Sequence, residues 1–307
     1  MRKIKIGVLG CADIAKRMVV PNLLKTNKFE VVAFGSRSLE KATEYTSLFG
    51  GTPIEGYEEL IKFKDVEAIY IPLPTGLHFK WILKCLENNK HVFSEKSIAT
   101  DLNEVSKIIE IARGKKLCVY ENFMFPHHSQ IHFVNDLIYK GEIGKIRLLR
   151  SSFGFPIFNF ESNIRYKKEL GGGALLDAGA YTLMASQLFL GLNQKVISSC
   201  LSSLENEVDF LGSITLLNKD NIVSQLSFGF DNFYQNNIEI WGTKGKIIMD
   251  RAFTAGPDHI PTIIVNKGGV SENYQLPKDN HFIKILNEFH SSITENNYSN
   301  QFDQIIS

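Results

Sequence analysis

The stretch that most constrains this chain runs from Lys3 to Ala15 and reads Lys-Ile-Lys-Ile-Gly-Val-Leu-Gly-Cys-Ala-Asp-Ile-Ala. It predicts a buried strand, a tight turn and the first turn of a helix. Backbone N–H groups at such a helix start favour an anion, and in a parallel sheet this is usually a dinucleotide pyrophosphate. Of the three glycines in the fingerprint G-x-G-x-x-G only Gly10 is present, and Ala12 and Ala15 hold the other positions. The stretch alone therefore fits either a dinucleotide-binding turn or an ordinary α/β start.

The alternation of strand and helix continues as far as residue 122. Further strands are expected at 29–35, 52–54, 66–71, 91–96 and 117–120. Such alternation produces right-handed βαβ units and a parallel sheet, so we expect an α/β fold with an N-terminal Rossmann-type domain over 1–122. Ligands of these sheets bind beyond the C-terminal ends of the strands. The residues expected along that edge are Gly10, Ser36, Pro74, Lys96 and Asn122.

Residues at the end of the second strand indicate which dinucleotide is bound. NAD-binding domains carry an acidic residue about 20 positions after the glycine turn, where it binds the ribose hydroxyls. Here that place holds Ser36, followed by Arg37 and, one turn later, Lys41. A missing carboxylate together with a guanidinium suits a 2′-phosphate, so we expect NADP in preference to NAD. A polar surface turn without a cofactor role is the competing interpretation.

Composition argues against several classes of function. The 34 basic and 33 acidic residues give a net charge of +1, which does not favour a nucleic-acid-binding surface. No apolar run approaches the roughly 20 residues of a membrane-spanning helix, and the chain enters its first strand without a signal peptide. The four cysteines are scattered without C-x-x-C spacing, as reduced thiols would be. We expect a cytoplasmic protein with neither a nucleic-acid nor a membrane partner.

The second part of the chain, 123–307, predicts an α+β domain. A long strand is expected at 146–155, followed by a loop over 158–168. The glycines at 171–173 let the chain approach a neighbour closely before a helix that carries Asp177 and Tyr181 at i and i+4, on one face.

Strand-like segments dominate the remainder of this part. They are expected at 195–204, 208–217, 222–230, 236–241, 245–250, 262–266 and 271–276. They predict a large, mainly antiparallel open sheet that packs on helices with one face and needs a cover on the other. A closing helix is expected over 279–296.

Four separated stretches resemble one known family. They are the turn Gly10–Ala15, the run Ile71-Pro72-Leu73-Pro74 with His78, the pair Glu95-Lys96, and the run Gly171–Asp177 with Tyr181. In this order and spacing they are similar to the glucose–fructose oxidoreductase/inositol dehydrogenase (Gfo/Idh/MocA) family. Its members are two-domain NAD(P)-dependent oxidoreductases of sugars, inositols and related polyols. The resemblance covers nearly the whole chain and implies a substrate-binding and dimerisation domain over 123–307.

Two features indicate the branch of the family. Tyr181 stands four residues after Asp177, where inositol dehydrogenase-like members carry histidine. This pattern and the Gly-Cys-Ala-Asp-Ile-Ala turn look like the sugar-nucleotide 3-ketoreductases, glucose–fructose oxidoreductase and the dihydrodiol dehydrogenases. Ser97 departs from the family's Glu-Lys-Pro, which bears on the loop geometry rather than on Lys96.

Three residues are the predicted catalytic group. A ketone that accepts hydride develops negative charge on its oxygen and needs a proton donor and a nearby cation. The Tyr181 phenol can donate the proton, and Lys96 can supply the cation. The resemblance implies the same two roles, with Asp177 positioning the substrate or tuning Lys96. The competing interpretations are a core tyrosine, a solvated strand-end lysine and a structural carboxylate.

The predicted binding residues extend this group. Candidate substrate contacts are Arg165, His127 or its neighbour His128, and Tyr181. Adjacent histidines without a carboxylate or cysteine at ligand spacing do not predict a metal site. The predicted cofactor-binding residues, taken from the sheet edge and from the resemblance, are Gly10, Cys11, Ala12, Asp13, Ile14, Ser36, Arg37, Lys41, Leu73, Pro74, His78, Glu95, Lys96 and Asn122.

The leading interpretation is an NADP-dependent reductase of a keto-sugar, with a nucleotide-linked sugar as one form of the substrate. Alternatives are a dehydrogenase of a free sugar, an inositol-like polyol or a trans-dihydrodiol, and a non-catalytic nucleotide-binding regulator. The joint presence of Lys96 and Tyr181 argues against the regulator. The resemblance implies a homodimer or homotetramer that forms through the open sheet.

Overall fold

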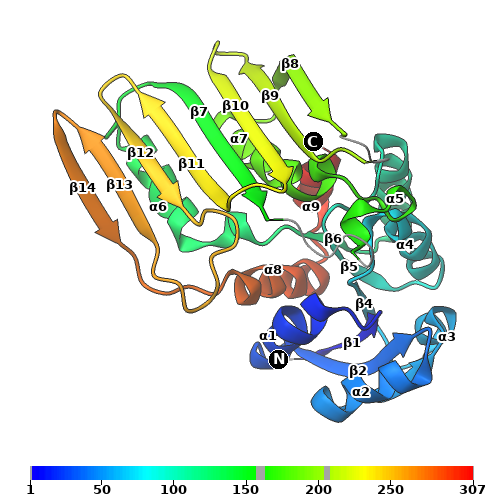
Figure 1. Ribbon diagram of the computed structural model, residues 1–307. Coiled ribbons are helices and arrows are strands. Elements are labelled where there is room, and N and C mark those ends of the chain that lie inside the picture. The colour runs from blue at the N-terminus through cyan, green and yellow to red at the C-terminus, as the bar shows by residue number, and fades with distance from the viewer. Residues whose placement is uncertain (1, 157–162, 204–207, 307) are drawn as a thin grey trace. The chain divides into compact units, whose positions relative to one another are not determined.

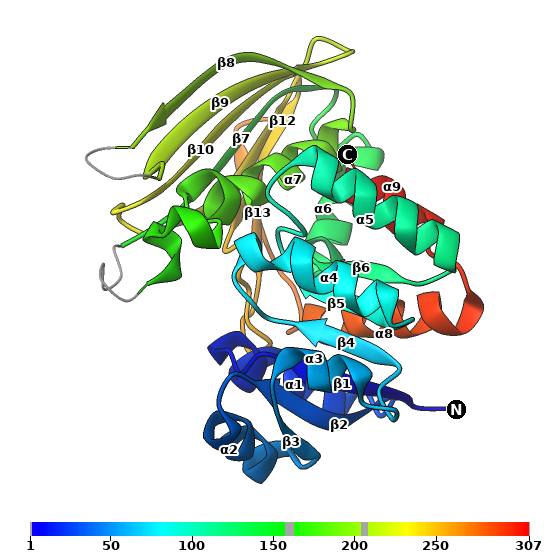
Figure 2. The same cartoon turned by 90° about the vertical axis from the view of Figure 1, so that its right-hand side faces the viewer.

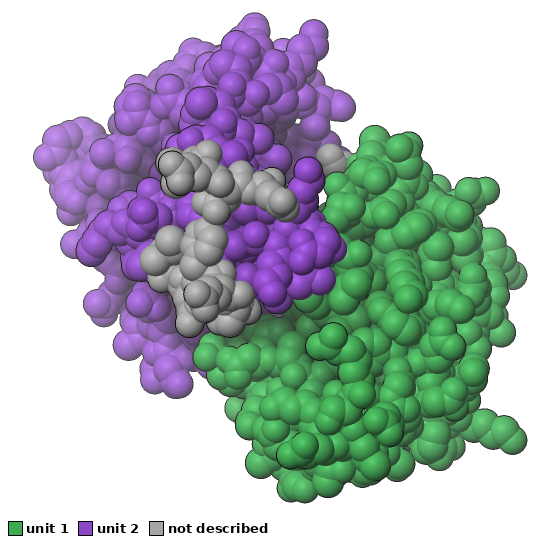
Figure 3. Space-filling view, turned by 45° about the vertical axis from the view of Figure 1, so that its right-hand side comes forward, with its two compact units in different colours: residues 1–123, 282–307 green, residues 124–281 purple. Residues whose placement is uncertain are grey.

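The computed structural model describes residues 2–156, 163–203 and 208–306. They fall into two compact units, one formed by 1–123 with 282–307 and the other by 124–281 (Figure 3). Residues 158–162 of the expected loop, and residue 204 at the end of an expected strand, lie outside the described residues. The C-terminal segment belongs to the unit of the N-terminal sheet, whereas the sequence analysis placed it in the second domain.

The first unit contains the expected parallel sheet (Figures 1 and 2). Its described strands lie in the order β3-β2-β1-β4-β5-β6, and all neighbouring pairs are parallel. All four residues of β4 are buried, as in a sheet covered on both faces. The strands are β1 (Ile4–Leu9), β2 (Phe29–Ser36), β3 (Thr52–Glu55), β4 (Ala68–Ile71), β5 (His91–Glu95) and β6 (Val119–Asn122). The Rossmann-type α/β fold is confirmed.

Helices connect these strands as the alternation predicted. Ser38 and Asp101 cap two of them through side-chain oxygens, which satisfy N–H groups of the first turn. On α3, Leu60 fills the space left by Gly7 and Gly35, because a Cβ at either glycine would press on its side chain. The helices are α1 (Val20–Lys25), α2 (Leu39–Phe49), α3 (Tyr57–Lys62), α4 (His78–Glu87) and α5 (Leu102–Lys115).

Two C-terminal helices complete the first unit. On α8 (His281–Glu295), the Phe289 ring stacks on Phe29 of β2 at 5.9 Å and lies 5.1 Å from the Phe93 ring of β5. On α9 (Ser299–Ile306), which the sequence analysis did not predict, Phe302 is buried. These aromatic contacts explain why the segment joins the N-terminal sheet.

The second unit is built on the expected open sheet. Its described strands run in the order β14-β13-β12-β11-β7-β10-β9-β8, and each neighbouring pair is antiparallel except β7 with β10. Helices α6 (Ser129–Tyr139) and α7 (Ala180–Leu190) lie on the same face of it (Figures 1 and 2). The strands are β7 (Ile146–Phe155), β8 (Gln194–Ser202), β9 (Leu211–Asn218), β10 (Val223–Phe230), β11 (Gln235–Gly242), β12 (Gly245–Asp250), β13 (Thr262–Lys267) and β14 (Val270–Gln275). Within the described residues, no helix has the length and apolar character needed to cross a membrane.

We predict that the first unit depends on Phe289. Replacing it by alanine should destabilise the protein by about 3–5 kcal/mol, because it removes a fully buried ring and leaves a cavity. Chemical denaturation followed by circular dichroism measures the change. The matched control is Phe233→Ala, since Phe233 is 88% exposed. Equal stabilities of the two variants would show that α8 does not complete this core.

Candidate functional site

The turn after β1 begins with a residue in a backbone conformation that glycine adopts easily. Gly10 has a φ of +117°, and a Cβ atom there would lie 2.7 Å from the Leu73 side chain. The Gly10 N–H donates to the Gly35 carbonyl at 2.9 Å, so the ends of β1 and β2 meet here. The chain then enters a single π-helical turn, Ala15–Val19. Residues 11–14 keep exposed surface, as a turn that binds a phosphate requires.

The end of β2 brings together the residues expected at a 2′-phosphate. The Ser36 hydroxyl accepts from the Ser38 N–H at 3.3 Å, and the Ser38 hydroxyl accepts from the Lys41 N–H at 3.4 Å. Between them, the exposed Arg37 lies close enough to the Tyr57 phenol for its charge to oppose the rise in the Tyr57 pKa that burial causes. Ser36, Arg37 and Lys41 therefore share one corner, at the start of α2.

Cys11 lies between the turn and this corner. Its thiol lies close enough to Ser36, Lys41 and Glu44 for each of them to affect the pKa of the thiol. Burial raises the pKa of the Cys11 thiol to about 11. The thiol is therefore protonated at neutral pH and adds no negative charge where an anion is expected.

His78 joins two loops of the sheet edge. It is fully buried, and its Nε2 lies 2.7 Å from the Leu73 carbonyl oxygen while its Nδ1 lies 2.7 Å from the Ser97 carbonyl oxygen. Burial lowers the pKa of His78. Leu73 and Pro74 follow β4 and Ser97 follows β5, so the imidazole holds the loops of adjacent strands together. His78 thus supports the predicted cofactor edge from inside the unit.

Lys96 follows directly after a buried carboxylate network. The Glu95 carboxylate accepts from the Tyr70 hydroxyl at 2.6 Å and from Asn122 Nδ2 at 2.7 Å. Burial raises the pKa of Glu95, and the two hydrogen bonds and the Lys96 ammonium counteract this. Asn122 is fully buried, and its Oδ1 has no hydrogen-bond partner among the described residues. The sheet edge therefore carries a buried acceptor beside Glu95.

A second carboxyl group, Glu121 on β6, supports the loop after Lys96. Its Oε1 accepts from the Ile98 N–H at 2.7 Å. Burial raises the pKa of Glu121 to about 7, while the Ile98 N–H and the Lys96 ammonium oppose the rise and Glu95 adds to it. Lys96 thus has two carboxyl groups within electrostatic reach, and one of them titrates near neutral pH.

The remaining predicted residues belong to the second unit. Tyr181, on α7, is 8% exposed. Its ring centroid lies 5.0 Å from that of Phe153, 5.6 Å from that of Phe253 and 6.0 Å from that of Phe125. The ring thus has the packing of a core aromatic, and this packing fixes the direction of the phenol group.

Asp177 and Arg165 form an ion pair. The Arg165 Nε donates to Asp177 Oδ2 at 2.5 Å. Asp177 lies in a single π-helical turn, Leu175–Gly179, so the regular α-helix assumed for the i, i+4 pair with Tyr181 is wrong at this point. The sequence predicts separate roles for Arg165 and Asp177, whereas in the structure they form one ion pair.

The glycines before this turn are required by close contacts, as the sequence analysis expected. A Cβ at Gly172 would overlap the Arg165 carbonyl, and one at Gly173 would overlap the Asp209 carboxylate. Asp209 Oδ2 accepts from the Leu175 N–H at 2.6 Å, and the Asp209 carbonyl accepts from the Ala174 N–H at 2.8 Å. Asp209 therefore anchors the turn that carries Asp177.

The two histidines differ in their surroundings. His127 ends a 3₁₀ turn and is partly exposed. His128 is fully buried, its Nδ1 accepts from the Gln130 N–H at 3.3 Å to cap α6, and its ring packs edge-on against His281. His127 is therefore the candidate of the two for a substrate contact. Within 2–156, 163–203 and 208–306, no group of three or more His, Cys, Asp or Glu residues could hold a metal ion.

Two family profiles match this chain. The oxidoreductase family GFO_IDH_MocA, with an NAD-binding Rossmann fold, matches residues 4–123, and the GFO/IDH/MocA C-terminal domain matches residues 131–248. The chain belongs to the Gfo/Idh/MocA family. The expected oxidoreductase class and two-domain fold are thereby confirmed.

Similar proteins come from the expected branch of the Gfo/Idh/MocA family. A dTDP-3,4-didehydro-2,6-dideoxy-alpha-D-glucose 3-reductase of Actinomadura kijaniata is 36% identical over 98% of this chain and 91% of its own length. One of the same name from Saccharopolyspora spinosa is 38% identical over 94% of this chain and 87% of its own. The crystal structure of KijD10, a 3-ketoreductase from A. kijaniata in complex with NADP and TDP-benzene, matches with a TM-score of 0.96 at 36% identity, covering 100% of this chain and 95% of that chain.

Three supporting residues of this Gfo/Idh/MocA chain were not predicted. Tyr70 lies within β4, where every residue is buried, and only its phenol distinguishes it there. Glu121 precedes Asn122 directly, and that Glu-Asn pair was a usable signal. Asp209 has no motif around it, because its partners Leu175 and Ala174 lie more than 30 residues earlier in the chain.

We predict that Glu121 makes stability fall as pH rises. Its folded pKa of about 7 exceeds the ordinary value of 4.5, so the folded state binds more protons than the unfolded state between these values. The contribution of protonated Glu121 to the free energy of unfolding is fully present below the pKa that Glu121 has in the unfolded state. It is lost as the pH rises through the pKa of the folded state.

The Glu121→Gln variant tests this dependence because an amide oxygen can still accept from the Ile98 N–H. The free energy of unfolding of this variant in urea, minus that of the parent, should increase by about 2 kcal/mol between pH 5 and pH 8. The expected increase is smaller than the full pKa shift would give, because Glu121 keeps some exposed surface. A difference that stays constant with pH would contradict the assignment.

Proposed function

We propose that this chain is an NADPH-dependent reductase that transfers a hydride to the keto group of a sugar carried on a nucleoside diphosphate. The observation that carries the proposal is the similarity over 98% of the chain to a dTDP-sugar 3-reductase. Lys96 and Tyr181 are both present, as reduction of a ketone requires. A 3-keto sugar linked to thymidine diphosphate is the proposed substrate class.

The residues of the first unit fit NADP. Arg37 and Lys41 offer cations for a 2′-phosphate, and Ser36 replaces the carboxylate that would repel it. The Gly10 turn has the backbone shape of a pyrophosphate-binding loop. The buried Oδ1 of Asn122 lacks a hydrogen-bond partner among the described residues and suits the N–H of a carboxamide. When bound, NADPH supplies the hydride.

The protein's own side chains manage the proton and the developing charge. In this proposal the Tyr181 phenol donates its proton to the carbonyl oxygen, and the Lys96 ammonium stabilises the negative charge on that oxygen. Carboxylates near Lys96 favour its charged form, and Glu95 and Glu121 supply them. The Asp177–Arg165 pair orients sugar hydroxyl groups, and His127 adds a further polar contact.

The direct test measures the oxidation of NADPH by the purified protein with a panel of carbonyl compounds. The panel contains TDP-linked and UDP-linked 3-keto sugars and the matching free keto-sugars. Turnover with a keto-sugar nucleotide at low concentration supports the proposal. Faster reduction of NADP with free sugars, inositols or trans-dihydrodiols would indicate a dehydrogenase instead of a reductase. NADPH binding without any turnover would indicate a regulator.

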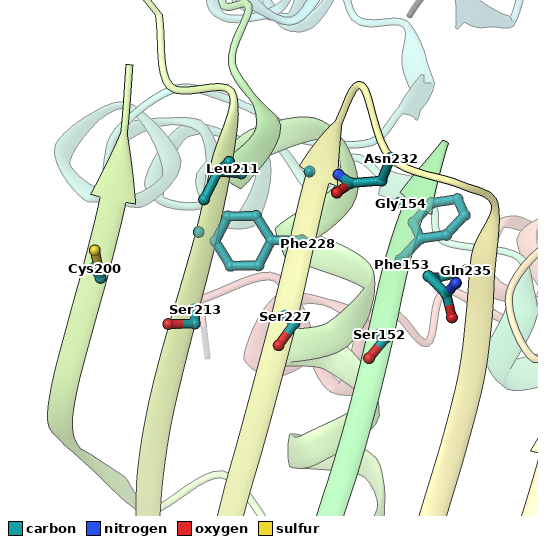
Figure 4. A pocket seen from close by; sticks show the side chains of 12 residues that line it. Ser152, Phe153, Gly154, Cys200, Leu211, Ser213, Ser227, Phe228, Asn232 and Gln235 are labelled. Atoms are coloured by element: carbon teal, nitrogen blue, oxygen red, sulfur yellow. The ribbon is translucent and has the colours of Figure 1, made fainter. Parts of the chain in front are cut away.

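The open face of the second sheet is the proposed interface between copies of the chain. Small side chains form a row there and line a hollow of about 370 Å³ (Figure 4). The register places Ser227 beside Ser152 on one side and Ser213 on the other, with Cys200 next in the row. On β8, Val196 is 64% exposed. An exposed sheet face of small and apolar groups suits a second copy of the sheet, and this supports a homodimer or homotetramer.

We predict that Tyr181→Phe loses most turnover while NADPH binding survives. Removing the phenol oxygen takes away the proton donor, so kcat should fall by about 10²- to 10⁴-fold.

Lys96→Ala should also lower kcat by orders of magnitude, because it removes the stabilising cation. Steady-state kinetics and NADPH fluorescence titration measure both effects. Unchanged turnover in either variant would remove that residue from the proposed chemistry.

We predict that Ser227→Arg breaks the assembly. A large cation in the middle of the small-residue row would prevent a second sheet from packing there, and light scattering at micromolar concentration should report a smaller particle. Ser106→Arg is the matched control, because Ser106 is exposed on α5 of the first unit. A parent protein that is already monomeric, or a Ser227→Arg variant of unchanged mass, would exclude this interface.

A further inference from the structure

One carboxylate of the first unit binds two lysines that border the predicted nucleotide corner. Glu44 Oε2 lies 2.6 Å from the Lys41 ammonium, and Glu44 Oε1 lies 2.9 Å from the Lys16 ammonium. Both ammonium groups also sit over the ring of Tyr45, at 5.6 Å and 5.8 Å from its centroid. We call Lys16, Glu44 and Lys41 the Glu44 cluster.

The Glu44 cluster lies where the adenosine end of a dinucleotide binds in this fold. Lys41 is in the first turn of α2, one turn after Arg37, and its N–H binds the helix cap Ser38. Lys16 is in the π-helical turn that follows the Gly10 turn. The ribose 2′ position of a bound dinucleotide is read at the end of the second strand. The cluster therefore borders the place of a 2′-phosphate from two sides.

The charges of the Glu44 cluster are partly cancelled. The pKa of Glu44 is lowered, first by its hydrogen bond with Lys41 and then by that with Lys16, so the group is ionised at neutral pH. The pKa of Lys41 is raised by the same hydrogen bond. One negative charge thus faces two positive charges, and the nearby Asp13 is itself paired with Arg17 at 3.3 Å.

We propose that Glu44 is a specificity-determining residue that competes with the 2′-phosphate of NADP(H) for Lys41 and Lys16. The inference rests on the proposed use of NADP. To bind the phosphate, Lys41 must give up part of its contact with Glu44, and the negative charge of Glu44 repels the phosphate. NAD(H) lacks the phosphate and does not enter this competition. Glu44 therefore weakens NADPH binding and moderates the preference for NADPH over NADH.

The test is Glu44→Gln, which keeps a hydrogen-bond acceptor and removes the charge. Titrations with NADPH, with NADH and with adenosine 2′,5′-bisphosphate are followed by calorimetry. Because exposed ion pairs are modest, NADPH and the bisphosphate should bind about two- to fivefold more tightly. NADH affinity should stay the same, and the gain should fade as salt is raised.

The matched control is Glu59→Gln on α3. Glu59 pairs with Lys62 at i, i+3, as Glu44 pairs with Lys41, but it is not part of the cluster. This control should leave both affinities unchanged. Lys41→Ala should weaken NADPH binding and leave NADH binding unchanged.

Three outcomes would overturn the inference. Equal tightening for NADPH and NADH in Glu44→Gln would indicate a general change of surface potential. Unchanged NADPH affinity would show that Glu44 does not compete with the phosphate. Weaker NADPH binding would show that Glu44 instead holds the two lysines in place for the phosphate. If the proposed use of NADP is itself wrong, the parent protein will bind NADH at least as tightly as NADPH. The titrations of the parent therefore separate that failure from the failure of the role proposed for Glu44.

Discussion

The parallel sheet depends on the Glu95 carboxylate, which joins three neighbouring strands at their C-terminal ends. Tyr70 from β4 and Asn122 from β6 donate to the same oxygen atom, Oε1. Withdrawing a carboxylate from water is unfavourable unless hydrogen bonds replace the lost solvation, so the strand ends and the charge of this part-buried group stabilise one another. Lys96 is the next residue, and Glu121 holds the backbone of its loop through Ile98. The position of the cation is therefore set by the sheet itself.

The same kind of backbone turn occurs in both units, close to predicted functional residues. A single π-helical turn precedes α1, at Ala15–Val19, and another precedes α7, at Leu175–Gly179. Such turns are rare and occur often at functional sites. A glycine with positive φ precedes each of them, Gly10 in the first unit and Gly173 in the second. Close backbone packing thus shapes the turn predicted to bind a phosphate in one unit and positions the carboxylate Asp177 in the other.

The features that were predictable from sequence are those encoded in adjacent residues. The strand periodicity, the Gly10 turn and the Arg37 corner each depend on a short run of residues. Pairings between distant positions leave no such pattern, which is why the bond between Tyr70 and Glu95 was not predicted. The role of His128 as a helix cap was missed for another reason. Histidine is uncommon at that position, where serine, threonine, aspartate and asparagine are preferred.

The chain leaves the N-terminal unit after Phe123 and returns to it at Phe282. The aromatic core that begins with Phe29 receives Phe289 only when the last helices have been made. During synthesis, then, the nucleotide-binding unit lacks part of its core until residues 282–306 have been made, while the intervening segment already has all of its own residues. This connectivity works against the usual order, in which the N-terminal domain folds first. A premature stop near the C-terminus would damage the half of the protein that was translated first.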